Sequence, residues 1–106
     1  MRRQNRHPGL EFVILMHGTA MNAIDEQELM DYAANGVISH FKIRETDEGR
    51  FCLVLTVSWK EGECILTSAR KTPRLWANVN TLAEYLRKLN QPKVPISLEL
   101  SFQGPS

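Results

Sequence analysis

"FCLVLTVSWKEGECILTSA", residues 51–69, decides the fold class of this chain. It contains two apolar runs in which large hydrophobic residues alternate with others, and a polar turn with a glycine separates them. That alternation is typical of strands that bury one face, and such a turn joins antiparallel neighbours. We therefore predict a β-hairpin. Its buried side carries Phe51, Leu53, Leu55, Val57 and Trp59.

The turn and the cysteines of this hairpin are consistent with one another. A two-residue turn at Glu61 and Gly62 would pair Trp59 with Cys64 on the core face. Cys52 then points to the opposite face, so we expect two reduced thiols and no disulfide. Neither cysteine has metal-ligand spacing around it, and reduced structural thiols favour a cytoplasmic protein.

The segment before the hairpin predicts another strand, which is the first of three in chain order. "VISHFKIRE", residues 37–45, alternates in the same way, and "TDEGR" after it has turn chemistry. Three consecutive strands joined by short turns predict an antiparallel meander. The core side of the first strand is predicted to carry Val37, Ser39, Phe41 and Ile43.

A helix is predicted before the meander, over about residues 26–34. Asp25 followed by Glu28 has the spacing of a capping box, and acidic residues suit the positive end of a helix dipole. Gly36 provides a stop signal. Leu29, Tyr32 and Ala33 are predicted to share the buried face.

A second helix is predicted within "ANVNTLAEYLRKLN", residues 77–90. Asn78 is one candidate for its N-cap, and Thr81 with Glu84 is another. Apolar residues recur at helical spacing and predict one buried stripe. This stripe consists of Val79, Leu82, Leu86 and Leu89.

The ends of the chain complete the predicted fold. "VPISLELSF", residues 94–102, predicts a last strand whose proline favours a sheet edge, with Ile96, Leu98 and Leu100 on one side. Residues 10–16 are either a short strand or a segment packed on the core. We predict one α+β domain over residues 10–102, a meander with two helices on one face in the order α-β-β-β-α-β, with a possible extra N-terminal strand. Residues 1–9 are expected to be a flexible basic arm and residues 103–106 a tail.

Composition limits the functional classes. The chain has 106 residues, 42% hydrophobic and 24% charged, as in ordinary globular domains. Its net charge is only +1, so attraction to nucleic acid would need a local basic patch. The apolar run of residues 10–16 is too short to span a membrane. The sequence after it fits a signal-peptide cleavage site poorly, so we expect neither export nor membrane insertion.

One local basic patch lies between the third predicted strand and the second predicted helix. Three basic residues fall within five positions around Thr72 and Pro73, and a tryptophan follows. A basic turn beside an aromatic ring can hold phosphate while the ring stacks on a base. The alternative is a solvated turn whose tryptophan covers the core. The candidate contact residues for nucleic acid or a partner are Arg70, Lys71, Arg74, Trp76, Arg87 and Lys88.

The sequence suggests no reaction. Nucleotide-binding glycine motifs and the GxSxG nucleophile motif are absent from it, and His7, His17 and His40 are too scattered for a metal site. We predict that Cys64 is a small core residue and not a nucleophile. We therefore expect no enzyme, no catalytic residue, no metal, no cofactor and no small-molecule substrate.

One family resemblance adds a biological context. The chain has a strand ending in "LTSAR", a basic "KTPRLW" segment and a helix with "LAEYL". Over roughly residues 37–89 it resembles the ParC-type partition-associated accessory proteins of bacterial plasmids and integrative elements. The resemblance implies a non-enzymatic accessory of a mobile element and transfers no catalytic residue. The residues that carry it are Leu66, Thr67, Arg70, Pro73, Arg74, Trp76, Leu82 and Leu86.

Two hypotheses from different classes follow. In the first, the protein contacts DNA, or a DNA-bound partition or replication protein, through the basic turn at residues 70–74. In the second, it is a protein-interaction module that regulates or inhibits a host or mobile-element protein through its sheet or its acidic helix. A homodimer formed through Val54 and Ile65 on the second face of the sheet belongs to this second hypothesis.

Overall fold

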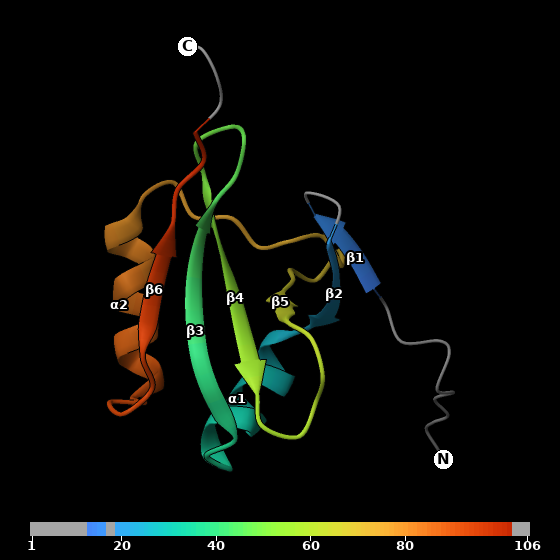
Figure 1. Cartoon of the computed structure of the whole chain (residues 1–106). Helices are drawn as coiled ribbons and strands as arrows, with labels where there is room; N and C mark the ends of the chain where they lie inside the picture. The colour runs from blue at the N-terminus through green and yellow to red at the C-terminus, as the bar shows by residue number, and fades with distance from the viewer. Residues whose placement is uncertain (1–12, 17–18, 103–106) are drawn as a thin grey trace.

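The computed structural model describes residues 13–16 and 19–102, which form one sheet with two helices (Figure 1). The predicted arm and tail lie outside these residues. Among the described residues, no helix has the length and apolar character needed to cross a membrane. The elements in chain order are β1 (Val13–Met16), β2 (Thr19–Ile24), α1 (Glu26–Ala34), β3 (Ile38–Glu45), β4 (Phe51–Val57), β5 (Cys64–Leu66), α2 (Val79–Leu89) and β6 (Ile96–Glu99).

The sheet has six strands in the order β1-β2-β5-β4-β3-β6. Strands β3, β4 and β5 are antiparallel neighbours, so the predicted meander is confirmed for the centre of the sheet. β2 lies parallel to β5, however, and β6 lies parallel to β3. The sheet is therefore mixed, and the prediction of a purely antiparallel sheet is wrong at both flanks.

Both helices cover the same face of the sheet, as predicted (Figure 1). Leu29 of α1 and Leu82 of α2 are completely buried in one cluster with Phe41, Leu53 and Leu55 from the central strands. This cluster is the main core of the domain. Burying it supplies most of the favourable free energy of folding, because the hydrophobic effect scales with apolar area removed from water.

Helix ends follow the sequence signals. Asp25 accepts a hydrogen bond from the Glu28 N–H, and the Glu28 side chain accepts one from the Asp25 N–H, which completes the predicted capping box. Asn78, rather than Thr81, is the N-cap of α2, and its side chain accepts from the Thr81 N–H. Asn90 ends α2 in the left-handed conformation.

Three details of the predicted strands are wrong. A bulge between Ile38 and His40 turns Ser39 outward, where its hydroxyl donates to the Thr56 carbonyl. β4 ends before Trp59, and this residue is 60% exposed. A longer connection than two residues follows β4, so Cys64 pairs with Leu55 instead of Trp59.

The second face of the sheet is also closed. Val54 and Ile65 are completely buried there with Met21 and Cys52, so the predicted dimer through an exposed Val54 and Ile65 is wrong. The face-to-face separation of the two cysteines is confirmed, because Cys64 belongs to the main core; both are free thiols.

Charged side chains of β3 lie on the same face as this second cluster. Lys42 contacts Glu63 at 2.7 Å, and Arg44 contacts Glu63 at 3.7 Å and Glu99 at 2.5 Å. Arg44 is only 8% exposed and also donates to the Met21 sulfur. The aliphatic stems of these long side chains cover apolar surface while their charged ends form ion pairs.

Candidate basic contact turn

The basic segment after β5 is a tight hairpin. The Arg74 N–H donates to the Leu66 carbonyl at 2.9 Å, and the Ser68 N–H donates to the Thr72 carbonyl at 2.8 Å. Thr67 and Pro73 face each other in an isolated antiparallel bridge. The chain therefore reverses over residues 69–71, and the basic turn predicted at residues 70–74 forms the tip and the second arm of this hairpin.

The tip of the basic turn carries two adjacent cations. Arg70 and Lys71 are both exposed, and neither side chain makes an ion pair within the part of the chain that the structure describes. The Arg70 N–H donates to the Ser68 hydroxyl, and the Lys71 N–H donates to the Ser68 carbonyl. Hydrogen bonds thus fix the backbone of two neighbouring residues whose cationic side chains are exposed to solvent.

Lys71 has a φ of 66°, in the left-handed region. Three-residue hairpin loops place a residue there, and glycine is preferred because a Cβ atom is strained in this conformation. The turn therefore retains a lysine at a position where backbone strain favours glycine.

Arg74 lies behind the tip and is engaged by other parts of the fold. Its guanidinium lies over the rings of Trp76 and Tyr85, at 4.8 and 4.9 Å from their centroids. It also contacts Glu26 of α1 at 3.4 Å. The Tyr85 hydroxyl donates to the same carboxylate at 2.7 Å. Burial raises the pKa of Tyr85 well above its ordinary value, and the hydrogen bond to Glu26 raises it further.

Trp76 serves mainly as a structural residue. Only 9% of it is exposed, and its ring packs against Tyr85 with centroids 5.3 Å apart. Its backbone exchanges hydrogen bonds of 2.8 and 2.9 Å with Phe51, the first residue of β4. Little of the ring remains for stacking on an outside base, so the geometry favours the core-covering alternative for this residue.

Arg87 and Lys88 are exposed in the last turn of α2, away from the basic turn. Arg87 forms an ion pair with Glu84 one helical turn earlier. Arg74 of the basic turn contacts Tyr85, which lies two and three positions before Arg87 and Lys88 in α2. Within the described residues, neither Arg87 nor Lys88 makes an ion pair or a ring contact with the basic turn. Among the six predicted contact residues, the structure therefore brings only Arg74 and Trp76 into direct side-chain contact.

The sequence prediction missed the most exposed indole. Trp59 is 60% exposed; its ring and that of Tyr32 form a T-shaped pair with centroids 5.7 Å apart, and the Lys60 ammonium lies 5.4 Å from its centroid. The signal was the polar "KEGE" run directly after it, which indicates that the strand has already ended. Trp59 follows the end of β4 while Trp76 bridges its start, so the two rings cannot act as one stacking surface.

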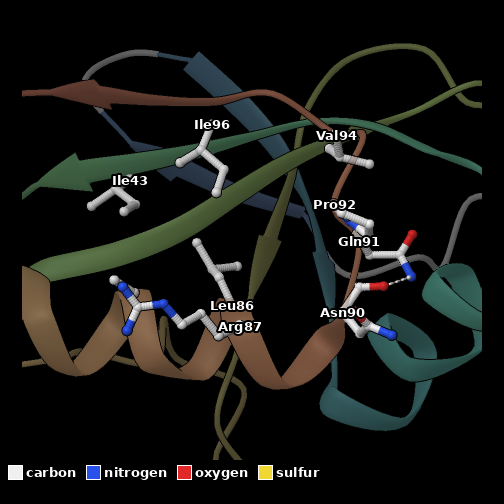
Figure 2. A pocket seen from close by; sticks show the side chains of 9 residues that line it. Ile43, Leu86, Arg87, Asn90, Gln91, Pro92, Val94 and Ile96 are labelled. Atoms are coloured by element: carbon white, nitrogen blue, oxygen red, sulfur yellow. Dashed lines mark hydrogen bonds between the residues drawn. The ribbon is translucent and has the colours of Figure 1, made fainter.

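An apolar cavity of about 410 Å³ lies between α2 and β6 (Figure 2). Leu86 approaches it from the helix, while Ile43 and Ile96 approach it from the sheet. The remaining residues that line the cavity are Ala83, Arg87, Asn90, Gln91, Pro92 and Val94.

Within the described residues, no group of three histidine, cysteine, aspartate or glutamate side chains is placed to hold a metal ion.

Comparisons with known proteins do not assign a family. No protein-family model matches the chain, and a search of curated proteins finds no match.

Proposed function

We propose that this chain is a non-enzymatic accessory protein of a bacterial mobile element that contacts DNA, or a DNA-bound partner, through the basic turn. The observation that supports this proposal is the pair of exposed, unpaired cations at the tip, Arg70 and Lys71. Guanidinium and ammonium groups on a fixed loop suit the phosphate backbone, which dominates nucleic-acid affinity. The family resemblance supplies the mobile-element context.

The two tip cations and Arg74 have different roles in this proposal. Arg70 and Lys71 would contact phosphate, because their charges face solvent. Arg74 would hold the turn in place, because its guanidinium already contacts Glu26 and two aromatic rings. Removing Arg74 would therefore change both the charge and the stability of the domain, so a clean test must leave it in place.

The protein-interaction hypothesis has less support through the surfaces first considered for it. The acidic side chains of α1 are used within the chain: Asp25 and Glu28 form the capping box, and Glu26 binds Arg74 and Tyr85. The second face of the sheet is occupied by its own buried cluster and ion pairs.

The test is a DNA titration with two variants of equal charge. Labelled duplex and single-stranded DNA are titrated with wild type and with Arg70→Ala/Lys71→Gly, which removes both tip charges and suits the backbone at position 71. Arg50→Ala/Lys93→Ala removes two exposed cations from other loops and serves as the control. We expect the tip variant alone to lose affinity. The slope of log K against log salt should become shallower by about 2, because each phosphate contact contributes about 0.9.

Two results would overturn the DNA contact. One is the absence of binding by the wild type at low salt, and the other is an equal loss in the tip and control variants. If DNA is not bound, capture of a partition or replication protein by wild type but not by the tip variant would support the partner form of the proposal. Arg87→Ala/Lys88→Ala, measured alongside, shows whether the far end of α2 contributes.

A further inference from the structure

Strand β6 leaves one edge of the sheet open. It is last in the strand order and pairs only with β3, with Ile96 opposite Phe41 and Leu98 opposite Ile43, within the described residues. The Phe41 N–H donates to the Pro95 carbonyl, so the odd-numbered residues of β6 bond to β3. In a parallel ladder the N–H and C=O groups of Ile96 and Leu98 then point away from β3, toward the open edge.

The same residues expose an apolar row. Side chains of alternate residues lie on one face of a strand, and this row faces the helix side of the sheet. Natural sheets protect open edges with charges or prolines. Here Pro95 has its nitrogen on the β3 side, so it does not block the edge. The exposed fractions are 54% for Ile96, 51% for Leu98, 46% for Leu100 and 88% for Phe102.

We propose that two copies of this chain form a two-fold dimer in which β6 pairs antiparallel with β6 of the second copy, with Leu98 on the axis. Outward-pointing backbone groups of both strands would then complete each other's hydrogen bonds, and the two sheets would become one. A second copy of the chain fits because this edge is complementary to itself. Both the residues that face one another across the axis and the cavity between α2 and β6 indicate this.

Charge selects the register. With Leu98 opposite itself, Glu99 of one copy faces Ser97 of the other, which can donate a hydrogen bond to it. A shift by two residues in one direction places Glu99 opposite Glu99, and like charges directly opposite are destabilising. A shift by two in the other direction places Glu99 opposite Pro95, whose side chain has no hydrogen-bond donor for the carboxylate. A shift by one residue puts the apolar rows on opposite faces.

The cavity beside β6 supports the same register. When Leu98 lies on the axis and the pairing extends beyond both ends of β6 (Ile96–Glu99), Phe102 of the second copy lies opposite Val94. Val94 lines the apolar cavity, together with Ile96 and Leu86 (Figure 2). Phe102 is the most exposed of the large apolar residues in the described part of the chain. Dimer formation would bury two phenyl rings in two symmetry-related cavities, with a favourable hydrophobic contribution from each.

The test uses charges of opposite sign at the axis. We expect wild type to sediment at twice the chain mass of 12.1 kDa. Leu98→Lys and Leu98→Glu should each raise the dimer dissociation constant on the order of 100-fold, because each places like charges opposite one another. Equimolar mixing should restore the dimer. Leu75→Lys is the control, because Leu75 is 41% exposed and lies elsewhere on the surface. Far-ultraviolet circular dichroism checks that each variant is folded.

The proposal is overturned if wild type remains a monomer at the highest soluble concentration, which would leave this edge to a peptide from another protein. It is also overturned if both Leu98 variants dimerise like wild type, if their mixture stays monomeric, or if Leu75→Lys dissociates equally. None of these results affects the proposed DNA contact, because Leu98 lies outside the basic turn.

Discussion

Replacing Arg74 by alanine should destabilise the domain, although the sequence places this residue among exposed cations. The guanidinium joins three separate parts of the fold: Glu26 at the start of α1, Tyr85 in α2, and Trp76 after the basic turn. Alanine would remove all of these contacts at once and leave the Glu26 carboxylate with only the Tyr85 hydroxyl from this cluster.

The expected cost follows from the exposure of these groups. The ion pair contributes about 0.2–1 kcal/mol, because the Arg74 and Glu26 side chains are 39% and 52% exposed. Each cation–π contact of a partly exposed arginine contributes about 0.5–1 kcal/mol. These contributions share one guanidinium and part is offset by its ordering entropy, so we expect Arg74→Ala to lower the free energy of unfolding by about 1–2 kcal/mol. Arg70→Ala should change it by less than about 0.5 kcal/mol.

Urea unfolding followed by circular dichroism measures both values. Arg74→Lys is an informative third variant, because it keeps the charge but loses the planar group that stacks on the rings. It should fall between wild type and Arg74→Ala. Equal stability of Arg74→Ala and Arg70→Ala would refute the structural role of Arg74, and it would return Arg74 to the set of free cations in the basic turn.

Three further predictions concern single residues. Asp25→Ala should cost about 1 kcal/mol in the same urea assay, because it removes the N-cap bond to the Glu28 N–H; an unchanged midpoint would contradict this. Lys71→Gly should raise the free energy of unfolding by about 0.5–1 kcal/mol, because it relieves a side chain at φ 66°; a loss of stability would contradict it. Burial raises the pKa of Cys52 from 9.0 to about 11, so its thiol should resist Ellman's reagent at pH 8 until the protein unfolds. The free energy of unfolding that this protonated thiol contributes is fully present below pH 9 and is lost as the pH rises to 11. The urea midpoint of the wild type should therefore fall over that range, and the fall should be smaller in Cys52→Ala.

The elements that were correctly predicted are those with strong local signals. The capping box at Asp25 and Glu28 fixes the start of α1, and the leucine stripe fixes the buried side of α2. Alternation in β4 gives the central strand and its core face. Each of these signals depends on residues only a few positions apart, so one sequence is enough to read them.

The pairing of strands that are distant in sequence could not be predicted in the same way. β2 has the sequence "TAMNAI", whose small and polar residues show no alternation of large apolar side chains. Its stability as a strand comes from its neighbours, including the Thr67 N–H and hydroxyl, which both donate to the Ile24 carbonyl. The β4–β5 register was mispredicted because a two-residue turn was assumed, whereas the polar connection before Cys64 is longer. Local spacing does not determine such choices.

The basic turn shows why charge in a sequence is an incomplete guide to a binding surface. Three cations within five residues look equivalent, yet the fold gives Arg74 a carboxylate and two rings and leaves Arg70 and Lys71 in water. The difference arises because Glu26 and Tyr85, which are distant in sequence, converge on one of the three. Only Arg70 and Lys71 can bind another molecule without giving up a contact within the chain.

Strand β6, at one edge of the sheet, shows the same principle. Two odd-numbered residues are committed to the fold: Pro95, just before β6, accepts a hydrogen bond from β3, and Glu99 forms an ion pair with the buried Arg44. Its even residues, Ile96 and Leu98, bury only about half of their surface in the chain. Among the described residues, the exposed half of each of these side chains has no apolar neighbour to cover it. Because a partner strand would bury the other half of this surface, the even positions are where selection for association, separate from selection for folding, would act.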